Sequence, residues 1–168
     1  MPRITYSAAE RDAWYVGLPG VVVAAGALIT DPAGRVLLVQ ANYRDHWTVP
    51  GGICEPGEPP QAGCRREVAE ETGLAVGPGP LLAVDWTMPF GDQQRPMMHF
   101  IFDGGTVPDG SGIVLQEEEL EAWRLATAQE CPGYMDEGSL GRLRAALAGR
   151  AAGATVYRPG SGQDQPLS

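Results

Sequence analysis

The chain has 168 residues, enough for one domain with a sizeable hydrophobic core. Its 21 Asp and Glu residues outnumber its 12 Lys and Arg residues, and the net charge of −9 excludes a broad nucleic-acid-binding face. Three cysteines without a C-x-x-C pair argue against a disulfide framework or a structural zinc site and fit a reducing cytoplasm.

The N-terminal segment, residues 1–20, is expected to be an extension that precedes the domain. It lacks the apolar h-region of a signal peptide. The apolar stretch at 14–29 is broken by Gly-Leu-Pro-Gly and is too short to cross a bilayer comfortably, so it predicts a buried strand. We therefore expect a cytoplasmic protein with no membrane partner.

Strands dominate the first part of the chain. Residues 21–30 and 35–40 are apolar, and the turn sequence Asp-Pro-Ala-Gly between them predicts a hairpin. A short strand at 46–52 ends in a glycine turn. A helix is expected from residue 59 or 60 to 72, because proline near its start and Gly73 after its end match the usual helix boundaries.

The second part of the chain alternates less regularly. Strands are predicted at 81–88 and 97–105, then an acidic loop before a strand at 122–125, a helix at 139–150 and a short strand within 154–160. This order is not a regular βαβ alternation and predicts an α+β fold with a mixed sheet between helices. We expect one domain over residues 21–158 and a flexible tail over 159–168.

The helix at 59–72 contains the sequence "REVAEE", which concentrates negative charge. Glu67, Glu70 and Glu71 stand at i, i+3 and i+4, so their carboxylates share one face, where like charges repel. Arg66 can pair with Glu70 at i+4. Oxygen ligands clustered in this way suit a hard divalent cation such as Mg²⁺, which is typically held by a few carboxylates and substrate phosphates.

Small residues before and within this helix complete the pattern. Gly51 and Gly52 permit a tight turn that exposes backbone carbonyls beside the helix. Gly63 is expected to leave room for a ligand on the carboxylate face, and Ala62 and Ala69 are expected to pack on the sheet from the opposite face.

The sequence resembles the Nudix hydrolases through the pattern G-x5-E-x7-R-E-U-x-E-E-x-G-U, in which U is aliphatic. The chance of such a match at one start site is roughly one in a hundred million. The resemblance extends from about residue 20 to 126. The matching residues are Gly52, Glu58, Arg66, Glu67, Val68, Glu70, Glu71, Gly73 and Leu74.

The resemblance implies a Nudix fold, an αβα sandwich, and a MutT-like hydrolase that uses Mg²⁺ or Mn²⁺ to cleave a nucleoside diphosphate linked to another moiety. The substrate class would be ADP-ribose, a nucleotide sugar or a (d)NTP. It implies an arginine and a glutamate, Arg66 and Glu58, that orient the site. It also implies metal ligands at Glu67, Glu70 and Glu71 and at the carbonyl of Gly51.

A later acidic residue usually completes the site in similar proteins. Glu117, Glu118 and Glu119 are the candidates, and Glu119 is favoured because it stands four residues before Trp123. We expect Glu67, Glu70, Glu119 and Arg66 to be the catalytic residues. Either Glu119 or Glu67 would be the general base.

Three residues are candidates for contacting the substrate: Arg44, Trp47 and Trp86. Arg44 lies in a loop near the expected cavity and could meet a phosphate. Trp47 could stack on a base, although a place in the core is favoured. For Trp86, lining the pocket and packing are equally supported.

Other functions remain open at this point. A domain that binds a nucleotide metabolite without turnover is the main alternative. Isomerase chemistry on isoprenyl diphosphates lacks a convincing cysteine and glutamate pair, and mRNA decapping is disfavoured by the lack of basic segments. The expected partner is a small nucleoside diphosphate derivative rather than nucleic acid, and a homodimer is compatible with the sequence.

Overall fold

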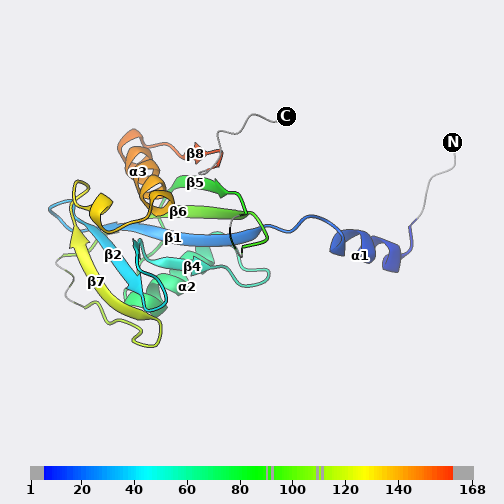
Figure 1. Cartoon of the computed structure of the whole chain (residues 1–168), viewed down its shortest axis with the longest axis horizontal. Helices are drawn as coiled ribbons and strands as arrows, with labels where there is room; N and C mark the ends of the chain where they lie inside the picture. The colour runs from blue at the N-terminus through cyan, green and yellow to red at the C-terminus, as the bar shows by residue number, and fades with distance from the viewer. Residues whose placement is uncertain (1–5, 90, 92, 109, 111, 161–168) are drawn as a thin grey trace.

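The computed structural model describes residues 6–89, 91, 93–108, 110 and 112–160. In these residues three α-helices accompany one mixed sheet of eight strands (Figure 1). The helices are α1 (Ala8–Val16), α2 (Pro60–Thr72) and α3 (Glu137–Ala152), and a 3-10 turn spans Cys131–Gly133. The strands are β1 (Val22–Thr30), β2 (Val36–Ala41), β3 (Trp47–Thr48), β4 (Gly51–Ile53), β5 (Leu81–Thr87), β6 (Met97–Thr106), β7 (Leu120–Ala126) and β8 (Val156–Arg158).

The sheet is mixed because its central pair is parallel while most outer pairs are antiparallel. Its main order is β3-β2-β1-β6-β5-β8, with β4 paired to β1 and β7 paired to β2. Strands β1 and β6 run parallel, and β5 is antiparallel to β6. Helix α2 packs on β1 and β4, whereas α3 packs chiefly on β5 and β8. The predicted αβα sandwich is therefore confirmed.

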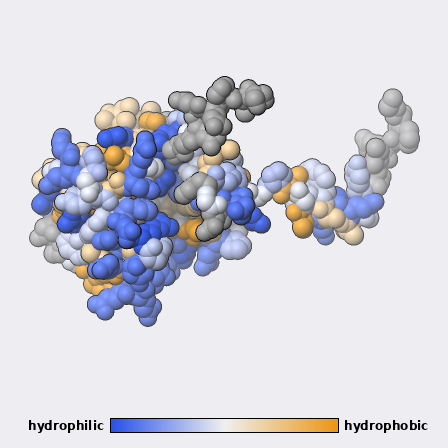
Figure 2. Space-filling view, in the orientation of Figure 1, coloured by the Kyte–Doolittle hydropathy of each residue, from blue (hydrophilic) through white to orange (hydrophobic). Residues whose placement is uncertain are grey.

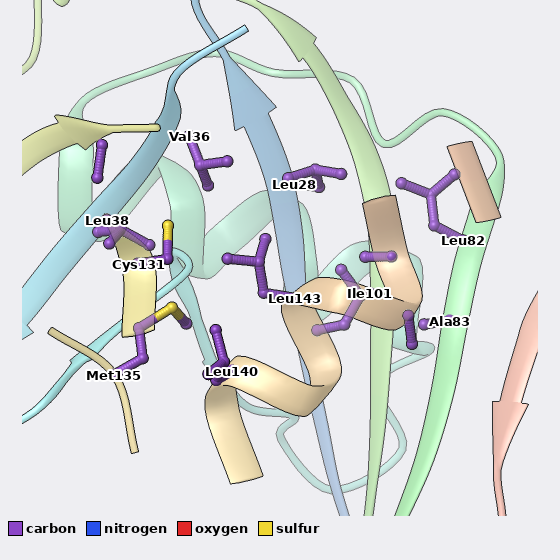
Figure 3. Packing of buried hydrophobic residues seen from close by; sticks show 13 residues of the cluster. Leu28, Val36, Leu38, Leu82, Ala83, Ile101, Cys131, Met135, Leu140 and Leu143 are labelled. Atoms are coloured by element: carbon purple, nitrogen blue, oxygen red, sulfur yellow. The ribbon is translucent and has the colours of Figure 1, made fainter. Parts of the chain in front are cut away.

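Both faces of the sheet are buried, which explains why its strands are continuous apolar runs. Leu28 and Leu38 pack with Leu143 of α3 in one core cluster (Figure 3). Their chain neighbours Ile29 and Leu37 point to the opposite face and join the cluster under α2. This alternation follows from the two-residue period of a strand and places one helix on each side.

The predicted hairpin between the first two strands forms, but the strands soon separate. The turn is closed by hydrogen bonds between Asp31 and Arg35, and only Thr30 and Val36 are in register. Beyond that pair, β2 pairs with β7 along its length, while β4 takes the adjacent edge of β1. The separation of β1 from β2 leaves space at this end of the sheet.

Helix α2 is oriented differently from the sequence-based expectation. Ala62 and Ala69, expected to pack on the sheet, are exposed, and the buried face instead carries Cys64 and Val68. Gly63 does not leave room for a ligand, because a Cβ there would lie 2.7 Å from Sγ of Cys54. The helix ends at Gly73, whose φ of 69° is the left-handed conformation that glycine adopts readily.

Helix α1 was not predicted. It buries none of its residues and lies apart from the sheet (Figure 1). Its start is fixed by a capping box in which the hydroxyl of Ser7 accepts from the Glu10 amide and the Glu10 carboxylate accepts from the Ser7 amide. Apolar patches are visible on this helix, whereas the face of the body in the same view is mostly hydrophilic (Figure 2). In the described part of the chain, no helix is long and apolar enough to span a bilayer.

Candidate active site

A cavity of about 500 Å³ lies where β1 and β2 separate. Residues of β1, β2, β4 and β6 form its walls, and side chains of α2 and α3 reach it from the two sides of the sheet. Its size falls within the usual range of small-molecule sites. The ionisable side chains that line it are Tyr43, Arg44, His46, Glu67, Glu71, His99, Glu119 and Arg142.

Glu71 is the most buried carboxylate of the cavity wall. Its residue is 9% exposed, and its Oε2 accepts a hydrogen bond of 2.8 Å from the amide of Gly51. Burial raises the pKa of Glu71 to about 8, the Gly51 amide opposes this shift, and the charges of Glu67 and Glu119 reinforce it. A bound cation in this wall would relieve the same repulsion.

Glu67 and Glu119 line the same cavity from different elements. Glu67 lies on α2, one turn before Glu71, and Glu119 comes from the turn that precedes β7. Burial raises the pKa of Glu67, the hydrogen bond from Arg66 lowers it, and the charges of Glu70 and Glu119 raise it further. Of the three consecutive glutamates at 117–119, only Glu119 is among the described lining residues.

Arg66 joins the carboxylates of α2 to the preceding loop. Its guanidinium donates to both carboxylate oxygens of Glu58, with Nε–Oε1 at 3.1 Å and Nη2–Oε2 at 3.0 Å. Its Nη1 lies 2.9 Å from a carboxylate oxygen of Glu67 and 2.9 Å from one of Glu70. The pKa of Glu58 is lowered chiefly by this arginine. Neither Arg66 nor Glu70 is among the described lining residues of the cavity, and the Glu70 side chain is 49% exposed.

The glycine turn brings the backbone of β4 against β1 and α2. Gly51 has a φ of 143° and faces Gly26 of β1 in the strand register. A Cβ on Gly26 would lie 2.6 Å from the carbonyl oxygen of Pro50, so the close approach needs glycine. A Cβ on Gly52 would lie 2.5 Å from Cδ of Glu67, so this glycine makes room for a carboxylate of the site.

The three predicted substrate-contacting residues separate in the structure. Arg44 lines the cavity. Trp47 does not: it packs against the α3-side core, with the guanidinium of Arg124 4.7 Å from its ring. Trp86 is also outside the described lining, and its Nε1 donates to Sδ of Met88.

Several lining residues had no assigned role in the sequence, among them His99 on β6, and Ser139 and Arg142 on α3. Burial and the positive charges of Arg142 and Arg44 lower the pKa of His99 to about 3, so its imidazole is neutral at pH 7. A single histidine in a strand and one arginine among several in an amphipathic helix give no pattern that marks them in advance.

The donor set of the cavity fits a hard divalent cation. Carboxylates and a backbone carbonyl are the oxygen ligands that Mg²⁺ and Mn²⁺ accept. Within the described residues no three His, Cys, Asp or Glu side chains are grouped so as to ligate one ion. Mg²⁺ usually keeps several waters and takes further oxygens from substrate phosphates, so few protein ligands are needed.

The model of the NUDIX domain family matches residues 20–144, which include most of the chain and every described lining residue of the cavity. The chain belongs to the Nudix family. Diphosphoinositol polyphosphate phosphohydrolase 2 of Rattus norvegicus is 40% identical over 90 residues, which cover 53% of this chain and 42% of the relative. The chain thus spans less than half of this curated relative's length.

Solved structures of Nudix proteins share the fold. The MutT protein from Methanosarcina mazei Go1 has a TM-score of 0.64 and 25% identity, with 80% of this chain and 96% of that chain covered. An Ap4A hydrolase of C. elegans has a TM-score of 0.61 and 26% identity, with coverage of 79% and 99%. Both of those structures are thus matched over nearly their whole length.

Proposed function

We propose that this Nudix protein is a metal-dependent hydrolase that cleaves the pyrophosphate bond of a nucleoside diphosphate linked to another moiety. The observation that carries the proposal is that Glu67, Glu71 and Glu119 line the same cavity, where Glu71 accepts a hydrogen bond from the backbone of Gly51. Names of relatives agree with phosphoanhydride substrates, since they include a diphosphoinositol polyphosphate phosphohydrolase and an Ap4A hydrolase.

Glu67, Glu71, Glu119 and the carbonyl of Gly51 are the groups that would hold Mg²⁺ or Mn²⁺. Glu70 stays a predicted ligand, and it would have to exchange its hydrogen bond from Arg66 for the cation. When bound, the cation would neutralise the diphosphate and lower the pKa of a coordinated water. Arg66 positions the carboxylates of α2, and its bidentate contact with Glu58 fixes its own orientation.

Two carboxylates can act as the general base. Glu67 is half-buried and forms an ion pair with Arg66, whereas Glu119 is exposed and lies on a turn. Each could accept the proton of the attacking water before phosphorus is attacked. Glu119→Gln and Glu67→Gln separate the roles. Loss of the general base should remove the fall of kcat at low pH. Loss of a metal ligand should instead raise the metal concentration needed for the half-maximal rate.

The test of the proposal is a phosphate-release screen over ADP-ribose, nucleotide sugars, dinucleoside polyphosphates and (d)NTPs with Mg²⁺ or Mn²⁺. We expect turnover of at least one compound and its loss in EDTA. Glu71→Gln should lower the rate by at least about 100-fold, by analogy with removal of other charge-stabilising groups. Glu118→Gln, an exposed neighbour of Glu119 outside the described lining, is the matched control and should retain the rate.

Absence of metal-dependent turnover across the whole panel would contradict the proposal. A compound that raises the melting temperature without being consumed would instead favour a nucleotide-binding domain. We further propose a small-molecule partner, in keeping with 21 acidic against 12 basic residues, and a cytoplasmic location, in keeping with three cysteines that form no C-x-x-C pair. Homodimer formation stays a prediction that sedimentation velocity would test.

A further inference from the structure

The α3 side of the cavity carries positive charge that the proposed metal chemistry does not use. Arg142 lines the cavity, yet its side chain is only 17% exposed. Its Nη2 donates to the hydroxyl of Ser139 at 2.9 Å, and its Nη1 lies 3.5 Å from Oδ2 of Asp85. Within the described residues these are the hydrogen bonds that its guanidinium makes, so three of its five N–H groups remain available.

Asp85 does not neutralise Arg142 fully, because it serves two guanidiniums. Its carboxylate is fully buried, and its Oδ1 accepts the shorter bond, 2.8 Å, from Arg158. Oδ2 is shared between Arg142 at 3.5 Å and the hydroxyl of Thr87 at 3.3 Å. Counted without Asp136, the two arginines and Asp85 leave one positive charge in excess in this cluster. Such an excess is costly unless an anion approaches it.

The other nearby carboxylate has a different task. The negative charge of Asp136 partly offsets the positive charge of Arg142 without a hydrogen bond between them. Oδ1 of Asp136 accepts a hydrogen bond of 2.7 Å from the Ser139 amide and so caps α3. Its Oδ2 lies 3.6 Å from Nε2 of His46. Asp136 thus stabilises the first turn of α3, which carries Ser139, and its hydrogen bonds do not go to Arg142.

Ser139 holds Arg142 at this end of the cavity. It is 3% exposed, lines the cavity, and its Oγ accepts the bond from Arg142, while its side chain also hydrogen-bonds Asp136 and helps to lower the pKa of that carboxyl. His99 lies on β6 opposite Asp85 and lines the same cavity as Arg44 and Arg142, whose positive charges lower the pKa of its imidazole. Arg44 also lowers the pKa of Glu71, so its charge reaches both the carboxylates and His99.

We propose that Arg142 and Ser139 form a second anion-binding position, and that the substrate is a nucleoside diphosphate compound carrying one additional phosphate group. This inference rests on the proposed function and narrows its substrate class. The diphosphate would lie at the carboxylate wall with its cation, and the additional phosphate would accept hydrogen bonds from the Arg142 guanidinium, which Ser139 holds in place. Only two arginines line the described cavity, and the sequence contains no lysine. A compound with many phosphates therefore lacks partners here.

Matched compounds that differ by a single phosphate provide the test. ADP-ribose is compared with ADP-ribose 2′-phosphate, and dephospho-coenzyme A with coenzyme A. Binding is measured by calorimetry with Ca²⁺ in place of Mg²⁺, so that a cation is present at the carboxylate wall, and recovery of intact compound after each titration checks that hydrolysis does not contribute. For at least one pair, we expect the protein to bind the phosphorylated member at least about tenfold more tightly, the effect of one charge-assisted contact. Arg142→Gln should reduce this ratio to near one.

Arg144→Gln is the matched control, because Arg144 lies on the same helix, carries the same charge and is exposed. It should keep the preference. Ser139→Ala is a smaller change that should reduce the preference by a few-fold, and it keeps the test decisive if Arg142→Gln does not fold. Equal binding within both pairs, or a preference that survives in the folded Arg142 and Ser139 variants, would overturn the inference.

Hydrolysis assays with Mg²⁺ separate this inference from the proposed function. A phosphate preference in binding that depends on Arg142, without turnover of any compound, supports the second anion position and contradicts the hydrolase. Turnover with no preference for the phosphorylated members supports the hydrolase and contradicts the second position.

Discussion

Arg66→Met tests whether one guanidinium organises the carboxylates of α2. The change removes four charge-assisted contacts: two to Glu58, one to Glu67 and one to Glu70. It also removes a hydrogen bond of 3.2 Å to the carbonyl of Ile53. Methionine keeps much of the apolar volume of the side chain, so the principal loss is electrostatic.

The magnitude follows from the burial of each partner. The side chain of Glu67 is 15% exposed and that of Arg66 is 25% exposed, so the cost of removing this contact lies below the cost of about 3–5 kcal/mol for a fully buried pair. The pair with Glu70 is exposed and contributes less than about 1 kcal/mol. Discounting for partial exposure, we expect Arg66→Met to lower the free energy of unfolding by about 3 kcal/mol in EDTA.

Urea denaturation of the variant, in EDTA and in Mg²⁺, measures this loss. Because Glu67 and Glu70 are released from the arginine, Mg²⁺ should stabilise Arg66→Met more than it stabilises the unmodified chain. Arg65→Met, which changes an exposed neighbour with the same charge, should remain within about 0.5 kcal/mol. A loss below about 1 kcal/mol for Arg66→Met in EDTA would refute the role given to Arg66.

Three further changes test other parts of the structure. The pKa of His99 in the folded protein is about 3, below its usual 6.5, so its stabilising contribution is complete above pH 6.5 and is lost as pH falls towards 3. Between pH 6.5 and 5, the free energy of unfolding measured by urea titration should fall by about 1.5 kcal/mol more in the unmodified chain than in His99→Gln. Gly52→Ala should displace the Glu67 carboxylate and reduce kcat/KM by on the order of 10- to 100-fold, while Gly77→Ala, with open space around it, should not; equal rates would contradict the contact. Deletion of residues 1–17 should change the free energy of unfolding by less than about 0.5 kcal/mol, since α1 buries no residue, and a larger loss would show that the helix contributes to the fold.

Helix α2 and the sheet were predictable because their sequence signals are local. Proline at the start of α2 and Gly73 at its end mark its bounds, which agree with the prediction to one residue. Apolar runs that alternate between two cores marked β1, β2 and β6. The capping box of Ser7 and Glu10 is an equally local signal for α1, but no helix was predicted within residues 1–20.

The orientation of α2 was not predictable from its pattern alone. Alanine fits both a buried and an exposed face, so Ala62 and Ala69 could not report which face meets the sheet. The boundary between the exposed and the buried face of α2 passes between Glu70, which is exposed, and its neighbour Glu71, which is buried. Glu71 shares the buried face of α2 with Val68 and accepts a hydrogen bond from the Gly51 amide, whereas Glu70 pairs with Arg66 at the surface.

The predicted tail at 159–168 lies almost wholly outside the described residues, and the division into an extension, a domain and a tail stays a prediction. The residues of α3 illustrate a more general limit. Arg142 and Arg144 are two positions apart in one helix, yet one lines the cavity and the other is exposed. The difference depends on the position of α3 over β5 and on Asp85, which lies 57 residues earlier in the chain.

An acidic protein can bind an anionic substrate because charge acts locally at such a site. At physiological ionic strength, exposed charges are screened over about 8 Å, so the net charge of −9 has little influence inside a cavity enclosed by the sheet. Within the cavity, the carboxylates of α2 lie at one side and Arg142 at the other, with Arg44 within range of both groups. A cation would reverse the sign of the first side and leave the second unchanged. The separation of β1 from β2 is what gives one ligand access to both, which is why Gly26 and Gly51, the pair that lets β4 approach β1, matter as much to the site as its charged residues.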